Sequence, residues 1–192
     1  MTAIILAGGK ATRMKGRDKA FLKINNEPFI ERQIRLLKKI FKKIIIVTNS
    51  SERYRVVRGV TIVCDIIPHL GPLGGIYSGL TASSSFCNFV VACDMPFLDT
   101  GFIEHMHREY YGYDAVVPRI NGKYEPLFAF YSKRCRIVIR QLLDEKIFKM
   151  SELCSRIRVR EITEEEIRHC AVGEKMFTNI NTEKDFAYVY AG

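Results

Sequence analysis

Short apolar runs that alternate with helical patterns constrain the fold of this sequence more than any other feature. Six such runs, rich in β-branched or aromatic residues, lie at 3–7, 43–48, 60–64, 88–93, 113–118 and 126–131. Their nearly continuous apolar character is typical of strands buried on both faces of a sheet. Helical patterns lie at 28–42, 72–82, 99–110 and 132–145, and 181–191 has the pattern of a capped terminal helix. The alternation predicts a Rossmann-like α/β fold, with a mostly parallel or mixed sheet and helices on both faces.

The length of 192 residues suits one well-buried domain, so we expect residues 1–192 to form a single domain. The content of 47% hydrophobic and 27% charged residues is that of an ordinary soluble globular protein. No apolar run approaches the length of a membrane-spanning helix, and the first ten residues lack the features of a signal peptide. These observations predict a cytoplasmic protein that does not contact membranes.

Cysteine and histidine residues give no sign of a metal site. The six cysteines include no C-x-x-C pair, and most lie in apolar runs, which predicts buried free thiols rather than disulfides or a zinc site. His105 and His107 are two residues apart on a predicted helix, so they point in different directions. His69 and His169 stand alone in the sequence.

The formal net charge of +9 indicates an acidic partner. Nucleic acid, membrane phosphates and small polyanions all meet that description. A nucleic-acid-binding protein usually interleaves basic residues with aromatic ones or contains a recognisable module. Here the densest basic run outside the first 22 residues is "LLKKIFKKIIIV", which has the pattern of a helix end followed by a strand, with its lysines in solvent. We therefore expect small polyanions as partners, and no nucleic acid.

The stretch "ILAGGKATRMKGRDKAFL", residues 5–22, places five basic side chains within ten residues directly after a strand and two glycines. Like charges at this density repel one another, so a compact loop that carries them favours a bound anion. The loop lacks the G-K-[ST] of a P-loop and the third glycine of G-x-G-x-x-G. Glycines allow backbone N–H groups to approach a ligand closely, and Arg13 and Lys19 can neutralise a triphosphate.

Polar or glycine residues follow several of the predicted strands. Strand 3–7 ends at Gly8-Gly9, strand 43–48 at Asn49, strand 60–64 at Asp65 shortly before "GPLGG", and strand 88–93 at Asp94. In open α/β sheets, ligands bind at the carboxyl ends of the strands, near the point where strand order reverses. Each feature alone is common in turns and helix caps, but together they predict one ligand site at this edge. A carboxylate such as Asp94 suits Mg²⁺, which prefers oxygen ligands.

These segments carry a resemblance to a known family. The blocks "LAGGKATRMKGRDKAFL", "TN", "GPLGG" and "ACDMP" resemble the signatures of the nucleotidyltransferase superfamily. The block "FTNINTEKD", residues 177–185, is similar to the closing N-x-N-T-x-x-D block of the molybdenum cofactor guanylyltransferase branch. The blocks occur in the same order and cover residues 4–185. One departure is an extra residue between Arg13 and Lys19, where the branch commonly has R-M-G-x-D-K.

The resemblance implies transfer of GMP from GTP to the phosphate of molybdopterin, with Mg²⁺ as cofactor and pyrophosphate as the second product. Proteins that mature molybdoenzymes are expected as further partners. By position, Leu6, Ala7 and Gly8 match the loop along the nucleotide. Lys19 matches the lysine that binds phosphate, and Arg13 corresponds to the signature arginine near the phosphates.

The remaining matched positions lie at later strand ends and near the carboxyl terminus. Asn49 and Asp65 match nucleotide-binding positions, and Asp94 matches the residue that binds both the nucleotide and magnesium. Asn179 and Asn181 match positions on the pterin side. We expect base selectivity to rest on backbone contacts near residues 6–8 and in a loop at 71–75.

Two alternatives remain open at this point. One is a sister nucleotidyltransferase, which uses CTP with the same pterin or acts on a sugar phosphate. The other is a nucleotide-binding or RNA-associated protein without turnover. A serine hydrolase is not needed to explain the serines at 83–85, because the attacking group is the acceptor's own phosphate and the run is typical of a loop.

Overall fold

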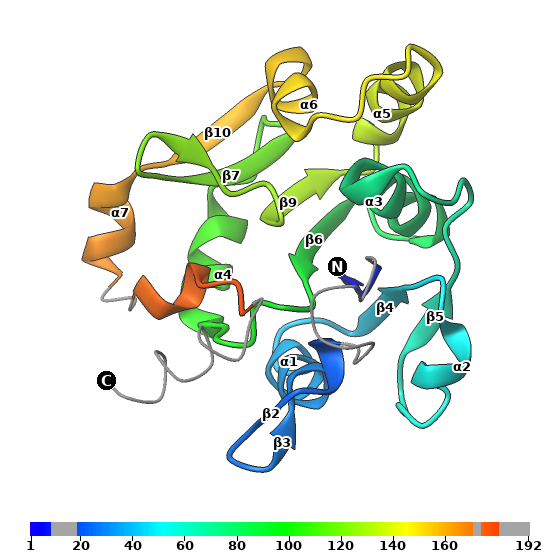
Figure 1. Ribbon diagram of the computed structural model, residues 1–192. Coiled ribbons are helices and arrows are strands. Elements are labelled where there is room, and N and C mark those ends of the chain that lie inside the picture. The colour runs from blue at the N-terminus through cyan, green and yellow to red at the C-terminus, as the bar shows by residue number, and fades with distance from the viewer. Residues whose placement is uncertain (9–18, 171–173, 181–192) are drawn as a thin grey trace.

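The computed structural model describes residues 1–8, 19–170 and 174–180, and within them a sheet of eight strands forms the centre of the molecule (Figure 1). The strand order is β10-β7-β9-β6-β1-β4-β5, with β8 paired to β7 at its end. The strands are β1 (Thr2–Leu6), β4 (Lys43–Val47), β5 (Thr61–Val63), β6 (Cys87–Ala92), β7 (Ala115–Ile120), β8 (Lys123–Tyr124), β9 (Phe128–Ser132) and β10 (Val159–Ile162). A separate small hairpin pairs β2 (Lys23–Ile24) with β3 (Glu27–Pro28).

Most neighbouring strands of the main sheet run parallel. β1 pairs in parallel with β4 and with β6, β4 with β5, and β7 with β10. β9 is antiparallel to both of its neighbours, β6 and β7. The chain passes outward from β1 through β4 to β5, and then returns to β6 on the other side of β1. The switch in strand order therefore lies between β1 and β6, which is where open α/β sheets bind ligands.

Helices cover both faces of the sheet, as the alternation of strands and helices predicts. The helices are α1 (Phe29–Leu37), α2 (Ser51–Tyr54), α3 (Gly71–Ala82), α4 (Thr100–Arg108), α5 (Cys135–Asp144), α6 (Met150–Arg156) and α7 (Glu164–His169), with short 3-10 helices η2 (Lys19–Phe21) and η3 (Glu174–Phe177). Side chains of α1, α4 and α7 pack on one face, and those of α3, α5 and α6 on the other (Figure 1). Strand β1 supplies Ala3 and Ile5 to the first core and Ile4 and Leu6 to the second.

All six predicted strands and the four predicted internal helices are present, with bounds that differ by a few residues. The helix expected at 28–42 ends at Leu37, and Pro28 precedes it as the N-cap. Sequence periodicity missed the half-exposed edge strand β10 and the short elements β2, β3, β8, α2, α6 and α7. The strands of this second group have two residues each, and its helices have four to seven, which is too short for a clear periodic pattern. The helix expected at 181–191 lies outside the described residues.

The expectation that most cysteines are buried was wrong. All six are free thiols, but only Cys135 and Cys154 are buried. Cys64 is exposed because it directly follows β5, the edge strand of the sheet. Among the described residues, no helix is both long enough and apolar enough to span a membrane.

Candidate nucleotide-binding site

The loop after β1 and the turn after β6 start side by side at the switch in strand order. The N–H of Cys93 donates to the carbonyl of Leu6 at 3.0 Å, and the N–H of Ala7 donates to the carbonyl of Val47 at 2.8 Å. Leu6 and Ala7 thus continue the sheet, with buried side chains. Gly8 is exposed, and a Cβ there would meet no described atom within 4 Å. The backbone first becomes open to a ligand at Gly8.

Asn49 and Asp65 lie together where β4 and β5 end. Nδ2 of Asn49 donates to Oδ2 of Asp65 at 2.7 Å, and the backbone N–H of Asp65 donates to Oδ1 of Asn49 at 3.3 Å. The other carboxylate oxygen, Oδ1 of Asp65, is buried and accepts no hydrogen bond from the described part of the chain. Burial raises the pKa of Asp65, against the opposing effects of Asn49 and of the charge of His69. A buried acceptor of this kind is costly unless a donor reaches it.

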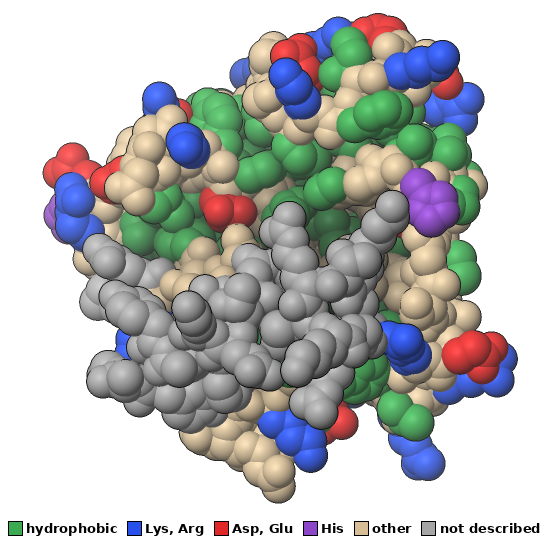
Figure 2. All heavy atoms as spheres, viewed as in Figure 1, with side chains coloured by type: hydrophobic (Ala, Val, Ile, Leu, Met, Phe, Trp, Pro, Cys, Tyr) green, Lys and Arg blue, Asp and Glu red, His purple; other side chains and the backbone are tan. Residues whose placement is uncertain are grey.

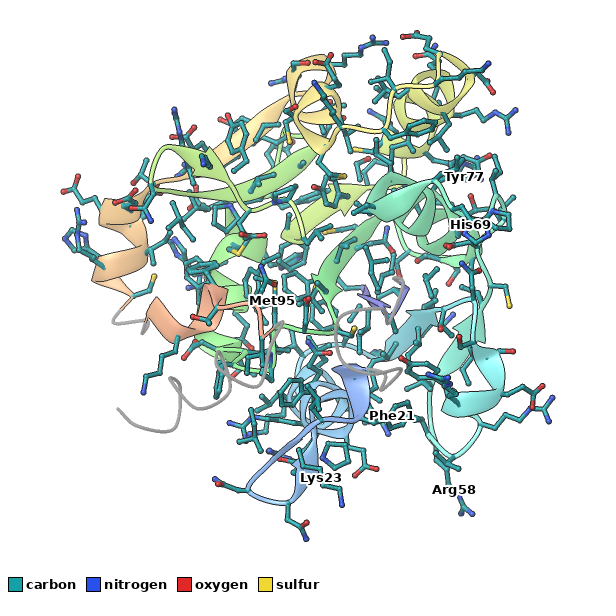
Figure 3. All side chains as sticks on the ribbon, in the orientation of Figure 1. Phe21, Lys23, Arg58, His69, Tyr77 and Met95 are labelled. Carbon is teal, nitrogen blue, oxygen red and sulfur yellow. The ribbon has the colours of Figure 1, made fainter. Side chains whose placement is uncertain are left out.

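The glycines of "GPLGG" form the first turns of α3, so the loop expected at 71–75 is wrong. They allow the helix to pack closely on β1. A Cβ at Gly75 would lie 3.2 Å from Cδ2 of Leu6 and 3.8 Å from Oδ1 of Asp65. One at Gly79 would lie only 2.5 Å from Cγ2 of Ile4. The glycines thus bring the start of α3 beside the Asn49–Asp65 pair (Figure 3 labels the nearby His69).

A buried glutamine holds the turn that carries Asp94. Nε2 of Gln33, on α1, donates to the carbonyls of Ala92 and Met95, both at 2.8 Å. Gln33 has no exposed surface, and Met95 is equally buried near the centre of the molecule (Figure 3). The sequence pattern did not predict a role for Gln33. The available signal was a polar residue at a position that continues the apolar face of α1, between Ile30 and Leu37.

The C-terminal end of the described residues contacts the turn that carries Asp94. The N–H of Ile180 donates to the carbonyl of Asp94 at 2.9 Å. The Ile180 side chain is fully buried and packs with Ile24 and Phe29. Asn179, one residue earlier, is exposed. The fold therefore brings the closing block of the sequence to the Asp94 turn.

Two of the predicted site residues, Arg13 and Asn181, lie outside the described residues. Lys19 is the first residue of η2. Among the others, Gly8, Asn49, Asp65, Asp94 and Asn179 lie at or next to strand ends on the carboxyl edge of the sheet.

Comparison with known proteins identifies the family of the chain. Residues 3–159 match the model of the MobA-like NTP transferase domain. The chain belongs to this family. A relative from Pelotomaculum thermopropionicum, named probable molybdenum cofactor guanylyltransferase, is 38% identical over 96% of this chain and 89% of its own. A protein of the same name from Clostridium perfringens is 35% identical over 96% of this chain and 93% of its own.

The fold is shared with a solved structure of similar size. The crystal structure of molybdopterin-guanine dinucleotide biosynthesis protein A from Archaeoglobus fulgidus superposes with a TM-score of 0.84 at 24% identity. The match covers 98% of this chain and 96% of that one. The resemblance inferred from the sequence blocks is thus confirmed, and so is the MobA-like α/β fold.

The donor set at the Asp94 turn fits magnesium. In the described ranges, no group of three or more His, Cys, Asp or Glu side chains could hold a metal ion by itself. A metal at Asp94 would have to complete its ligands with other oxygens. Mg²⁺ is usually bound in that way, by one or two carboxylates together with water and substrate phosphates.

The serines at 83–85 lie at the opposite edge of the sheet from this MobA-like site. Oγ of Ser85 lies 2.8 Å from Oγ1 of Thr2, the first residue of β1, and Ser84 accepts a hydrogen bond from Nζ of Lys43, the first residue of β4. The segment is an irregular loop, as predicted.

Proposed function

We propose that this protein transfers GMP from GTP to the phosphate of molybdopterin, which forms the guanine dinucleotide cofactor and releases pyrophosphate. The observation that carries the proposal is the main-chain hydrogen bond from Ile180 to Asp94. It joins the closing block, which is similar to that of the branch whose members transfer nucleotides to molybdopterin, to the Asp94 block, which is general for nucleotidyltransferases. The names of the relatives, matched over nearly the whole chain, support the same reaction.

The nucleotide lies, in this proposal, between β1 and the Asn49–Asp65 pair. Oδ1 of Asp65 lies beside Gly75, where an added Cβ would be 3.8 Å from it. Guanine presents two adjacent donors, N1–H and the 2-amino group, whereas cytosine presents only its 4-amino group. Either of the two guanine donors can supply the hydrogen bond that Oδ1 of Asp65 lacks. The side chain of Asp65 joins the backbone near residues 6–8 as a determinant of base choice.

In this proposal the phosphates of GTP are bound by basic residues that follow Gly8 in the sequence. The resemblance to the family assigns this role to Arg13 and Lys19. Asp94 holds Mg²⁺, which when bound neutralises charge on the phosphates. An oxygen of the molybdopterin phosphate attacks the α-phosphorus of GTP. The bond from the α-phosphorus to the bridging oxygen breaks, and pyrophosphate leaves with the electron pair. The acceptor is already an anion, so no protein nucleophile is needed.

The acceptor lies, in the same proposal, on the side of β1 that carries β6 and β9. Asn179 is exposed beside the Asp94 turn, and Asn181 follows it in the sequence. Their amide groups can donate to and accept from the pterin ring edge. Asn179→Ala should leave GTP binding unchanged and weaken molybdopterin binding. Weaker GTP binding with intact pterin binding would contradict this placement.

A pyrophosphate-release assay with each of the four NTPs, with and without molybdopterin, tests the reaction. We expect release only with GTP and molybdopterin together, and its loss in EDTA and in Asp94→Ala. Release with CTP instead of GTP would assign the protein to the cytidylyl reaction. No release with any NTP, despite measurable nucleotide binding, would reject the transfer reaction altogether.

A further inference from the structure

The antiparallel pairing of β6 with β9 brings a second acidic residue to Asp94. The register pairs Val90 with Ala129 and Val91 with Phe128. The next step is also present, because the N–H of Ala92 donates to the carbonyl of Leu127 at 3.0 Å. Asp94 lies two residues beyond Ala92, and Glu125 lies two residues before Leu127, so both residues come to the same end of the β6–β9 pair.

The segment after β6 and the segment before β9 each form a turn. After β6, the N–H of Met95 donates to the carbonyl of Ala92 at 3.3 Å. Before β9, the N–H of Phe128 donates to the carbonyl of Glu125 at 3.1 Å. The N–H of Glu125 in turn donates to the carbonyl of Pro118, on β7, at 2.8 Å. Two hydrogen bonds, one with Pro118 and one with Phe128, therefore fix the backbone of Glu125. Gln33 fixes the turn that carries Asp94.

Several of the described glutamates pair with an arginine, and Glu125 does not. Glutamates at 27, 52, 109, 145, 161 and 166 each form an ion pair with an arginine (acidic side chains are red and basic ones blue in Figure 2). No ion pair of the described side chains includes Glu125, although it is only partly exposed. Burial, and then the charge of Asp94, raise the pKa of Glu125.

We propose that Glu125 is the second protein carboxylate at the metal site, so that Asp94 and Glu125 together hold the divalent cation that carries the GTP phosphates. This assignment rests on the proposed function for the identity of the nucleotide. Two carboxylates that face each other in a partly buried place repel, and a divalent cation between them removes that repulsion. Two carboxylates, water and phosphate oxygens form a ligand set typical of Mg²⁺.

Binding of Mn²⁺, followed by electron paramagnetic resonance, tests the assignment without the transfer reaction. Mn²⁺ takes the same oxygen ligands as Mg²⁺. The titration is done with the full chain and a GTP analogue that has a methylene bridge between the α- and β-phosphates. Glu125→Gln should weaken Mn²⁺ binding about tenfold or more, and Glu125→Asp should weaken it less. Glu104→Gln, an exposed position on α4, is the matched control and should bind as the wild type does.

Thermal unfolding separates this role from a structural one. Glu125→Gln removes a like charge beside Asp94, so its melting temperature without metal should equal or exceed that of the wild type. Mn²⁺ should raise the melting temperature of the wild type more than that of Glu125→Gln. Unchanged Mn²⁺ affinity in Glu125→Gln would overturn the assignment. Unchanged Mn²⁺ affinity with lost molybdopterin binding would also overturn it, and would place Glu125 against the acceptor instead.

The same data distinguish failure of this inference from failure of the proposed function. If Mn²⁺ binding requires both carboxylates but no GMP reaches molybdopterin, the metal site stands and the proposed reaction fails. If guanylyl transfer proceeds and Glu125→Gln binds Mn²⁺ normally, only the assignment of Glu125 fails.

Discussion

Nδ2 of Asn49 donates to Oδ2 of Asp65 at 2.7 Å, which ties together two residues that follow adjacent strands, β4 and β5. The bond uses one carboxylate oxygen and leaves the other, which is buried, beside Gly75. Because Asn49 also accepts the backbone N–H of Asp65, the pair is fixed before any ligand arrives. Such preorganisation lowers the cost of binding a nucleotide.

Asp65→Asn should weaken GTP binding by roughly 1.5–3 kcal/mol, since it replaces a buried carboxylate acceptor by a neutral amide. Isothermal titration calorimetry with GTP and Mg²⁺ measures the loss. Asp144→Asn is the matched control, because Asp144 is an exposed residue of α5 that pairs with Arg140. Equal affinities for GTP in Asp65→Asn and the wild type would contradict the placement of the base.

Gln33→Met should destabilise the protein by about 1–3 kcal/mol, because it leaves the buried carbonyls of Ala92 and Met95 without their donor. It should also weaken Mn²⁺ binding, although Gln33 is not itself a ligand, because the turn that carries Asp94 loses its support. Urea unfolding and the Mn²⁺ titration measure the two effects. Gln141→Met, on the exposed face of α5, should change stability by less than about 0.5 kcal/mol.

Cys64 should be the thiol that reacts fastest with Ellman's reagent in the native protein. It is exposed, whereas burial raises the pKa of Cys135 to about 12 and that of Cys154 to about 11. Those two thiols stay protonated near pH 8, and thiolate is the reactive form. Cys64→Ser should remove the fastest phase, and Cys135 and Cys154 should react only in denaturant. A fast phase that persists in Cys64→Ser would contradict the exposure of this site.

The ion pair of Glu166 with Arg160 should make stability depend on pH in the acid range. Arg160, together with Thr163, lowers the pKa of Glu166 to about 2. A lowered carboxyl pKa stabilises the fold above the unfolded value of about 4.3, and this contribution is lost as the pH falls toward 2. Glu166→Gln should therefore cost about 1 kcal/mol at pH 6.

The difference in stability between Glu166→Gln and the wild type should shrink between pH 5 and pH 3. Urea unfolding at pH 6, 5, 4 and 3 measures it. A difference that stays constant over this range would show that the cost comes from packing or from the helix cap at Thr163 rather than from the charge.

The sequence by itself determined the six main strands, four of the helices and the order of the polar strand ends. These features depend on local periodicity, because a strand buried on both faces must be apolar whatever it packs against. The same local information placed Gly8, Asn49, Asp65 and Asp94 at one edge of the sheet. Local periodicity did not predict β10, because charged residues can occupy an edge strand. It also predicted a loop at "GPLGG", where glycines instead begin a closely packed helix.

Only the tertiary structure decided which distant residues meet at that edge. Gln33 reaches carbonyls 59 and 62 residues away, and Ile180 bonds to Asp94 from the closing block. Glu125 comes close to the Asp94 turn because β9 runs antiparallel to β6 and the N–H of Ala92 donates to the carbonyl of Leu127. Strand order and register arise from the packing of the whole sheet. No local pattern in the sequence contains that information.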